Sequence, residues 1–142
     1  MKNSLLPPVI VIAVGSYGDL FPYLRLAQAF QARGHAVQFV ASSYHRALVE
    51  QAGLPFIGLG NDEDYLRILR NPDLWDARKG FALLASFYPD LMREILATLS
   101  PHLQTSNWLI SHPLALPAAA QQGAWGVVER AAAAVLIYVL AA

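Results

Sequence analysis

The most constraining feature of this chain is a glycine-rich turn between an apolar run and a helical pattern. The apolar run Val9–Val14 ends at Gly15, the letters GSYGD open the turn, and the helical pattern then continues to Arg33, where Gly34 stops it. A second apolar stretch begins at Ala36. Strand, tight turn, helix and strand in this order make a βαβ unit, which places the turn at the carboxyl end of the first strand. Open α/β sheets bind their ligands at that edge, so the turn is the first candidate for a site.

The rest of the chain continues this alternation of strands and helices, which is typical of a parallel sheet. The further predicted strands are Ala36–Ala41, Pro55–Leu59, Asn107–Ser111 and Val135–Leu140. The predicted helices are Phe21–Arg33 with Pro22 in its first turn, Tyr44–Ala52, Asp64–Arg70, Phe81–Leu99 with a kink or break at Pro89, and about 117–133. We therefore expect an α/β fold, a Rossmann-like open parallel sheet of about five strands with helices on both faces, in a single domain over residues 1–142.

The composition agrees with this fold and argues against several classes of function. Hydrophobic residues make up 56% of the 142 residues and charged residues 14%, against about a quarter charged in a typical soluble domain. Parallel strands covered on both faces raise the apolar fraction, and so does a surface that a partner fills. The formal net charge is +0, so no basic excess supports nucleic-acid binding. Cysteine is absent, which excludes a disulfide framework and a thiolate metal site and is compatible with a cytoplasmic location.

Both ends of the chain carry apolar runs that resemble targeting or membrane segments. Near the amino terminus, Pro7 and Pro8 interrupt the run and the βαβ unit continues it, so we do not expect a signal peptide. The last run, Ala131–Ala142, is shorter than the roughly 20 residues that a spanning helix needs. The sequence is also compatible with a peripheral membrane contact.

Three short motifs around the glycine turn carry a family resemblance. They are G-S-x-G-D-x-x-P at Gly15–Pro22, L-A-x-A at Leu26–Ala29 and R-G-H-x-V at Arg33–Val37, with weaker matches at Ala52–Phe56 and His112–Ala115. In this order and spacing they resemble the amino-terminal half of GT-B glycosyltransferases, in the branch that glycosylates sterols, lipids and antibiotic aglycones. The resemblance covers roughly residues 8–118.

The resemblance implies the acceptor-binding domain of an inverting glycosyltransferase. In such enzymes a second Rossmann-like domain binds the nucleotide sugar, a UDP- or dTDP-sugar, so this chain would bind no cofactor itself. The acceptor would be a small apolar molecule such as a sterol, a lipid or a polyketide. The alanine-rich segment Ala118–Ala134 is longer than the family's helix there, and the chain stops at Ala142. We therefore expect a truncated first domain that lacks the donor domain and is inactive alone.

Asp19 is the residue of the turn best suited to chemistry. Sugar transfer with inversion needs a base that takes the proton of the acceptor hydroxyl as this hydroxyl attacks the anomeric carbon. The resemblance assigns that catalytic role to Asp19, at the position where related plant-type enzymes carry a histidine. The alternative is that Asp19 caps a helix beginning near Phe21, because aspartate is a favoured N-cap residue. The two roles compete for the same carboxylate oxygens, since a base must face the cleft.

Four other residues complete the candidate substrate site. Gly15, Ser16 and Gly18 either let acceptor or donor sugar approach the backbone, or form a tight turn that needs positive φ. His112 follows the fourth strand at the same edge and either lines the acceptor pocket or donates a structural hydrogen bond to the backbone. The glycine spacing fits neither a dinucleotide fingerprint nor a P-loop. No histidine pair or acid cluster indicates a metal site.

The other histidines and the aromatic residues can also be interpreted in two ways. His35 stands at a helix stop, so we expect a structural role, and His45 is a weak candidate for the pocket. The aromatic residues that form either an acceptor groove or simply part of the core are Trp75, Phe81, Phe87, Tyr88 and Trp108.

A second function class is a non-catalytic Rossmann-like module. Such a module would bind a small apolar ligand or a partner protein through the face that a second domain covers in the enzymes. The substitution Asp19→Asn would then leave ligand binding intact. An exposed apolar face would also favour a homodimer.

Overall fold

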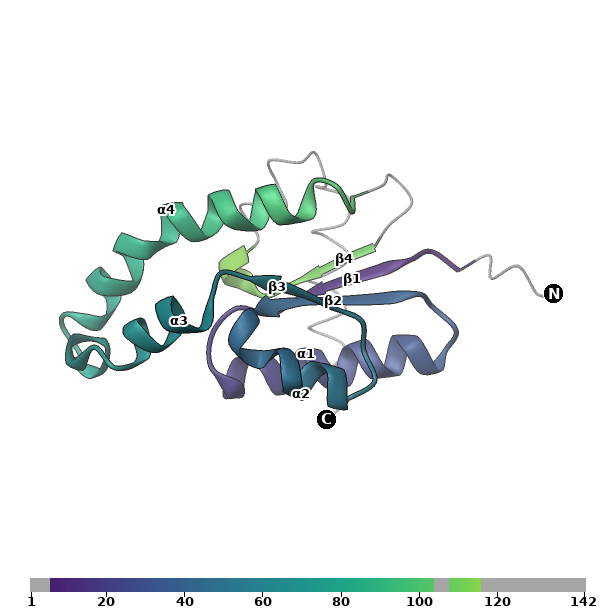
Figure 1. The fold of residues 1–142 in the computed structure, drawn as a ribbon, viewed down its shortest axis with the longest axis horizontal. Coiled ribbons are helices and arrows are strands. Elements are labelled where there is room, and N and C mark those ends of the chain that lie inside the picture. Colours follow the sequence, from purple (N-terminus) through teal and green to yellow (C-terminus); the bar gives the residue numbers. More distant parts are fainter. Residues whose placement is uncertain (1–5, 104–107, 116–142) are drawn as a thin grey trace.

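A four-stranded parallel sheet lies at the centre of the computed structural model, which describes residues 6–103 and 108–115 (Figure 1). The strands are β1 (Val9–Ile12), β2 (Val37–Ser42), β3 (Phe56–Leu59) and β4 (Trp108–Ser111), in the order β3-β2-β1-β4. All neighbouring pairs are parallel, with Val11 opposite Phe39 on one side and Ile110 on the other. Because β1 is an interior strand, all four of its residues are buried, as its unbroken apolar sequence predicts.

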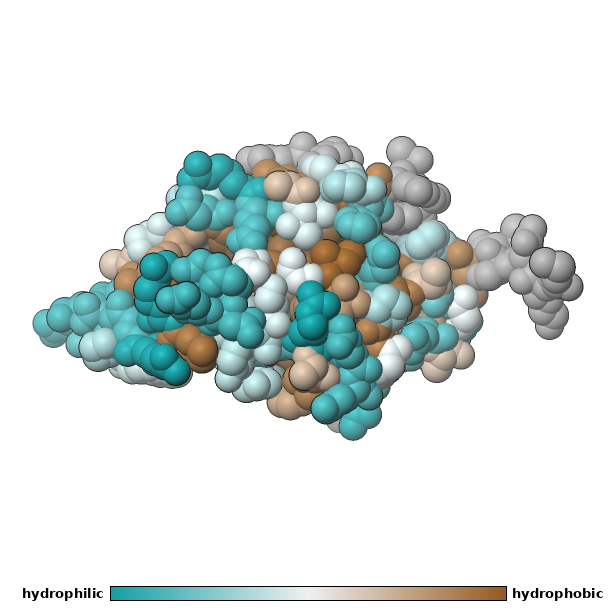
Figure 2. Space-filling model, in the orientation of Figure 1, coloured by the Kyte–Doolittle hydropathy of each residue, from teal (hydrophilic) through white to brown (hydrophobic). Residues whose placement is uncertain are grey.

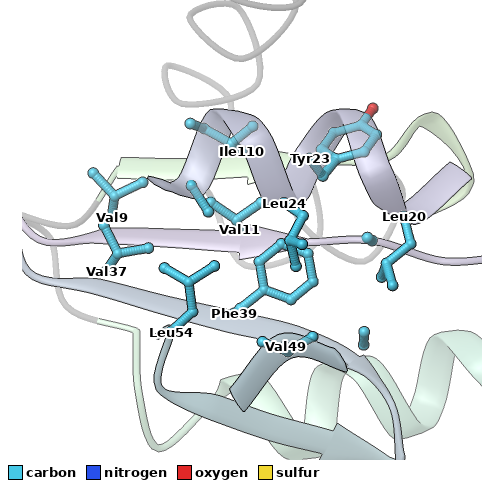
Figure 3. Packing of buried hydrophobic residues seen from close by; sticks show 13 residues of the cluster. Val9, Val11, Leu20, Tyr23, Leu24, Val37, Phe39, Val49, Leu54 and Ile110 are labelled. Carbon is cyan, nitrogen blue, oxygen red and sulfur yellow. The ribbon is translucent and has the colours of Figure 1, made fainter. Parts of the chain in front are cut away.

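Helices cover both faces of the sheet. The helices are α1 (Tyr17–Ala32), α2 (Arg46–Gln51), α3 (Asp62–Leu69) and α4 (Gly80–Leu99), with 3₁₀ turns η1 (Ser43–His45), η2 (Pro72–Trp75) and η3 (Pro113–Ala115). α1 and α2 lie on one face and α4 on the other (Figure 1). Alternate residues of β1 therefore serve different faces: Val9 and Val11 belong to one apolar cluster, Ile10 and Ile12 to the other. Figure 3 shows the first cluster around Phe39.

This arrangement confirms the predicted Rossmann-like α/β fold with helices on both faces. The predicted helix at about 117–133 and the predicted fifth strand, Val135–Leu140, lie outside the described residues.

One segment reaches beyond the carboxyl ends of the strands. α3, η2 and the first half of α4 project from that edge of the sheet (Figure 1). Gly80, at the start of α4, packs so closely on η2 that a Cβ there would lie 2.5 Å from the Leu74 carbonyl oxygen. The first half of α4, Gly80–Tyr88, carries no charged residue, whereas the second half buries Ile95 and Leu99 over the sheet.

The projecting segment exposes aromatic residues that the sequence suggested as core. Trp75 is 75% exposed and Phe81 is 84% exposed, so a core position is wrong for both, because the sheet does not extend beneath them. Phe87 and Tyr88 are partly buried, and Trp108 packs against the cluster around Phe39. Apolar residues lie among hydrophilic ones on this part of the surface (Figure 2).

α1 begins earlier than predicted, at Tyr17 rather than Phe21. Ser16, whose backbone is extended, is its N-cap residue. Pro22 therefore lies in the second turn, where its missing N–H leaves the Gly18 carbonyl without the usual helical partner. Gly18 is exposed, so water can bind that carbonyl.

The predicted helix Tyr44–Ala52 is divided into η1 and α2, and two further helix predictions need smaller corrections. α4 runs through Pro89 without being divided. Ala85, whose carbonyl loses its partner there, is exposed and open to water. α3 begins at Asp62 rather than Asp64, because the Asn61 side chain caps it by accepting the Asp64 amide at 2.9 Å.

Candidate active site

The turn after β1 is built around one glycine in a left-handed conformation. Gly15 has φ +125°, and a Cβ placed on it would lie 2.4 Å from Oδ2 of Asp19. Glycine is therefore required twice here, once by the backbone angle and once by the carboxylate that occupies the space of a side chain. Of the three residues predicted to form the turn, Ser16 caps the helix and Gly18 belongs to its first turn without a positive φ.

Asp19 is the third residue of α1 and closes a capping box with Ser16. The Ser16 amide donates to Oδ2 of Asp19 at 2.9 Å, and the Ser16 hydroxyl donates to the same oxygen at 3.0 Å. The carboxylate also lies in the first turn of the helix, where negative charge is favoured. The predicted position of Asp19 as the N-cap of a helix beginning near Phe21 is thus wrong, because Ser16 is the N-cap and Asp19 lies inside the helix. The S-x-x-D spacing of Ser16 and Asp19 is itself a capping signal that could have located this start.

The second oxygen of Asp19 faces His112. Nε2 of His112 lies 3.6 Å from Oδ1 of Asp19, just beyond hydrogen-bonding range. The Asp19 side chain is 44% exposed and the His112 side chain 15% exposed. Capping and chemistry were predicted to compete for the same carboxylate oxygens. In the structure they need not compete, because capping uses Oδ2, whereas Oδ1 faces His112.

The backbone around His112 defines which ring nitrogen carries the proton. The Leu114 amide donates to Nδ1 of His112 at 3.2 Å, so Nδ1 is an acceptor and the neutral ring has its proton on Nε2, the nitrogen nearest Asp19. The ring also lies against Tyr23, with centroids 5.7 Å apart. The His112 side chain thus accepts a hydrogen bond from the backbone. The structural role considered from the sequence was that of a donor to the backbone.

Two residues that the sequence did not connect with Asp19 hold the other side of the turn. The Gly15 carbonyl accepts a hydrogen bond from the Tyr65 hydroxyl at 3.2 Å and lies 3.3 Å from Nε2 of His45. His45 comes from η1, after β2, and Tyr65 from α3, after β3. The carboxyl ends of three strands are therefore joined at one carbonyl oxygen. No local sequence signal indicates these contacts, because they span 30 and 50 residues.

His45 is buried in a group of aromatic rings. Tyr17, Tyr44 and Tyr65 all make edge contacts with its ring, at centroid distances of 5.0, 5.6 and 5.1 Å. Burial lowers the pKa of His45, and the hydrogen bond to the Gly15 carbonyl offsets part of this effect. The ring is therefore neutral near pH 7 with its proton on Nε2, and the buried Nδ1 has no hydrogen-bond partner.

Tyr65 and Tyr23 share the electrostatic environment of Asp19. Burial raises the pKa of Tyr65, and the charges of Tyr17, Tyr44 and Asp19 add to the rise. Burial likewise raises the pKa of Tyr23, with the charge of Asp19 as the second cause. Both hydroxyls thus stay protonated and can donate hydrogen bonds throughout the physiological pH range.

His35 lies at the opposite, amino-terminal edge of the sheet and is structural, as predicted. It is buried, its Nδ1 lies 2.8 Å from the Pro7 carbonyl oxygen, and its ring packs against Phe30 and Trp108. It has no contact with the residues around Asp19.

Asp19 lies outside two surface depressions. One of about 580 Å³ is lined by Glu63, Arg67, Arg70, Asn71 and Pro72, and one of about 300 Å³ lies at the amino edge between β1 and β2. Neither includes Asp19. Within residues 6–103 and 108–115, no three metal-ligating side chains come together. None of the helices in these ranges combines the length and apolar character needed to cross a membrane.

The structure therefore brings four of the five predicted site residues into direct contact or close approach. Gly15, Ser16, Asp19 and His112 form one polar group at the carboxyl edge of the sheet. Gly18 stands beside it in the helix, where a Cβ would meet Ser16 Oγ at an ordinary 3.7 Å. Chemically, the group offers one tethered carboxylate with one oxygen that the cap does not use, and a histidine N–H beside that oxygen.

Curated relatives match part of the chain. O-mycaminosyltylonolide 6-deoxyallosyltransferase of Streptomyces fradiae is 39% identical over 56 residues, which are 39% of this chain and 13% of that enzyme. A sterol 3-beta-glucosyltransferase of Arabidopsis thaliana is 35% identical over 54 residues, which are 38% of this chain and 9% of that enzyme. The matched part is a small fraction of each relative's length.

Solved structures match more of the chain at lower identity. The glycotransferase of kitacinnamycin has a TM-score of 0.64 and 20% identity, covering 87% of this chain and 29% of that one. The glycosyltransferase SsfS6 of Streptomyces sp. SF2575, complexed with thymidine diphosphate, has a TM-score of 0.61 and 24% identity, covering 82% of this chain and 36% of that one. These similarities concern the fold, which is that of GT-B glycosyltransferases.

A family model agrees with both comparisons. The glycosyltransferase family 28 N-terminal domain matches residues 9–135. This range contains the four strands of the described sheet and every residue of the candidate site. The chain therefore belongs to the glycosyltransferase family 28 N-terminal domains and has the Rossmann-like fold of the amino-terminal half of a GT-B enzyme.

Proposed function

We propose that this chain is the acceptor-binding domain of an inverting, nucleotide-sugar-dependent glycosyltransferase in which Asp19 is the catalytic base. The observation that carries the proposal is that the two oxygens of the Asp19 carboxylate have different surroundings. Oδ2 of Asp19 is held by Ser16, while Oδ1 lies 3.6 Å from His112 on a side chain that is 44% exposed, at the carboxyl edge of the sheet. A base needs this combination of fixed orientation and an accessible oxygen.

Asp19 would act on the hydroxyl group of the acceptor. As the hydroxyl oxygen bonds to the anomeric carbon, the proton passes to the carboxylate, and the bond from that carbon to the nucleotide diphosphate breaks with its electron pair on the diphosphate. Attack opposite the leaving group inverts the anomeric carbon. The chemistry needs only a proton acceptor on this chain, which matches the open oxygen of Asp19.

His112 would orient the carboxylate rather than act as a second base. Its Nδ1 accepts from the Leu114 amide, so the neutral ring presents an N–H to Asp19 and has no free lone pair there. Closing the 3.6 Å separation to a hydrogen bond would require only a small movement, of the kind that substrate binding produces in many sites. His112 would then also line the acceptor site, together with the turn of Gly15 and Ser16.

The acceptor would be a small apolar molecule of the sterol, lipid or polyketide class. Support comes from the exposed Trp75, Phe81 and Leu84 on the segment that projects past the same edge of the sheet as Asp19. It also comes from the relatives, whose names refer to a sterol and to a tylonolide acceptor. The same exposed residues are compatible with a homodimer or a peripheral membrane contact, which stay predictions of the sequence.

The donor would be a UDP- or dTDP-sugar held mainly by a second domain. Similar structures are complexes with thymidine diphosphate or DTDP, and this chain covers only about a third of their length. We therefore expect the 142-residue chain to bind acceptor but not to transfer sugar unless it is joined to a donor-binding domain.

The test is Asp19→Asn in a protein that joins this chain to a donor-binding domain. Asparagine keeps the size and the hydrogen-bond acceptor toward Ser16 but cannot take a proton. We expect kcat to fall about 10²–10⁴-fold with acceptor affinity retained. The matched control is Asp90→Asn, an exposed carboxylate on α4 paired with Arg93, which should leave kcat unchanged. Unchanged transfer by Asp19→Asn would show that Asp19 is not the base, and absence of transfer by the unmodified two-domain protein would favour the non-catalytic module.

A further inference from the structure

The Gly15–Ser16 peptide group is held at both of its poles. Its C=O, on Gly15, accepts from the Tyr65 hydroxyl and lies within reach of His45 Nε2. Its N–H, on Ser16, donates to Oδ2 of Asp19. Because a peptide group is planar and rigid, the direction of the C=O fixes the direction of the N–H.

Gly15 itself does little to prevent this peptide from rotating. Gly15 has no side chain and tolerates both signs of φ, so its following peptide plane can turn at small cost. The space where a Gly15 side chain would lie is filled by the Asp19 carboxylate, so a rotation would also disturb that group. The two donors on the carbonyl therefore supply the restraint that the glycine lacks.

We infer that Tyr65 and His45 are positioning residues for Asp19, acting through the Gly15–Ser16 peptide. Both donate to the Gly15 carbonyl, and the peptide plane transmits their hold to the Ser16 amide and so to Oδ2. This inference deepens the proposed function and rests on it for its catalytic meaning. Under this inference His45 in η1 and Tyr65 in α3 help to orient the Asp19 carboxylate.

The tyrosine side chain is well placed to be a rigid donor. Its ring stacks on Tyr44 with centroids 4.8 Å apart and an interplanar angle of 19°, and it makes an edge contact with His45. The stack holds the ring in place, so its packing offsets part of the entropy lost when the side chain is ordered with its hydroxyl toward Gly15. His45 is fixed in turn by its burial among the tyrosines.

The test reads the Ser16 amide directly by NMR in the 142-residue chain. The signal of an amide that donates to a carboxylate shifts when that carboxylate is titrated, so the Ser16 amide is followed as the pH is lowered. We expect Tyr65→Phe, which keeps the ring stack but loses the hydroxyl, to reduce the amplitude of this shift to less than half and to speed hydrogen exchange at Ser16. The control Tyr44→Phe removes the hydroxyl of the stacking partner, which does not contact Gly15, and should leave both signals unchanged.

A histidine pair of variants provides a second measurement. Glutamine at position 45 retains a donor toward the Gly15 carbonyl, so His45→Gln should keep more of the Ser16 shift than His45→Leu. If His45→Leu does not fold, Tyr65→Phe still decides the matter.

In the two-domain protein, Tyr65→Phe should also lower kcat with little change in the KM for acceptor. A reduced Ser16 shift with an unchanged kcat would support the positioning role and count against Asp19 as the base. A Ser16 shift in Tyr65→Phe equal to that of the unmodified chain would overturn the inference.

Discussion

At the amino edge of the sheet, His35 is packed between two aromatic rings and bonded to the Pro7 carbonyl. At the carboxyl edge, His45 keeps a buried nitrogen without a partner and His112 stops just short of a hydrogen bond to Asp19. Histidine thus makes a structural hydrogen bond at one edge of the sheet, whereas at the other edge one histidine nitrogen is unpaired and another lies just beyond hydrogen-bonding distance of a carboxylate. Folding alone would favour the first arrangement everywhere, because unpaired buried polar groups are costly.

The glycines show the same contrast. Gly34, at the amino edge, and Gly53, at the end of α2, have positive φ values but only loose surroundings, with nothing closer than 3.7 Å to an added Cβ. Gly15 has a positive φ and a carboxylate pressed into the space of a side chain. The glycine turns at the two edges therefore differ in what requires glycine. At the amino edge it is the backbone angle alone, and at Gly15 it is the backbone angle together with the Asp19 carboxylate.

The sharpest stability test of this contrast is a pair of alanine substitutions. Gly15→Ala should lower the free energy of unfolding by about 3 kcal/mol, because it combines backbone strain with displacement of Asp19, whereas Gly53→Ala should cost about 1 kcal/mol from strain alone. Urea denaturation of both variants measures the difference. Equal costs would mean that the carboxylate yields freely and that the turn is not built around it.

His35→Leu tests the amino edge. Leucine refills the space between the rings of Phe30 and Trp108 but leaves the partly buried Pro7 carbonyl without its partner, so we expect a loss of about 1–3 kcal/mol in unfolding free energy. In the two-domain protein, kcat should stay unchanged. A fall in kcat without a loss of stability would contradict a purely structural amino edge.

The pH dependence of stability tests the carboxyl edge at His45. Its pKa is lowered in the folded chain, while the unfolded value is about 6.5. The unfolded state therefore binds more protons below that pH. The stabilising contribution of neutral His45 is complete above about pH 6.5 and is lost as the pH falls toward the folded pKa.

The check is urea denaturation of the unmodified chain and of His45→Gln at about pH 7.5 and about pH 5.5. Glutamine does not titrate, so the variant should lose less stability between the two pH values. The same loss in both proteins would show that His45 is not buried neutral.

The smallest stability effect is expected on the projecting segment. Trp75→Ser and Phe81→Ser change exposed side chains, so each should alter the unfolding free energy by no more than about 0.5 kcal/mol. Binding of an apolar acceptor, measured by calorimetry with a sterol or a polyketide aglycone, should nevertheless weaken. A large loss of stability would instead mean that these rings pack in solution as the core residues that the sequence suggested.

The parts of the fold that follow local rules were predictable from the sequence. The run Val9–Val14 and the stop at Gly34 defined the βαβ unit, since β-branched runs and glycine stops act locally. The start of α1 was missed because Gly18 and Pro22 are poor helix formers, although the Ser16–Asp19 capping box outweighs them at the first turn.

The candidate site was predictable only as far as one motif reached. Asp19 and its turn lie within eight consecutive residues, so their spacing carried the hypothesis. Tyr65 and His45 reach Gly15 from other strand ends, and only the folded topology brings them there. For Trp75 and Phe81 the sequence left a choice between core and acceptor groove, and a core position is usual for aromatic residues. The sequence does not tell where a helix extends past its sheet.

The most direct test of the account compares Asp19→Asn with His35→Leu in the same two-domain protein, by measuring kcat and the free energy of unfolding for each. The account predicts that Asp19→Asn lowers kcat about 10²–10⁴-fold and costs no more than about 1 kcal/mol of stability. His35→Leu should do the opposite, with kcat retained and stability reduced. If Asp19→Asn transfers sugar at the unmodified rate, the carboxyl edge does not hold the base and the central claim is wrong.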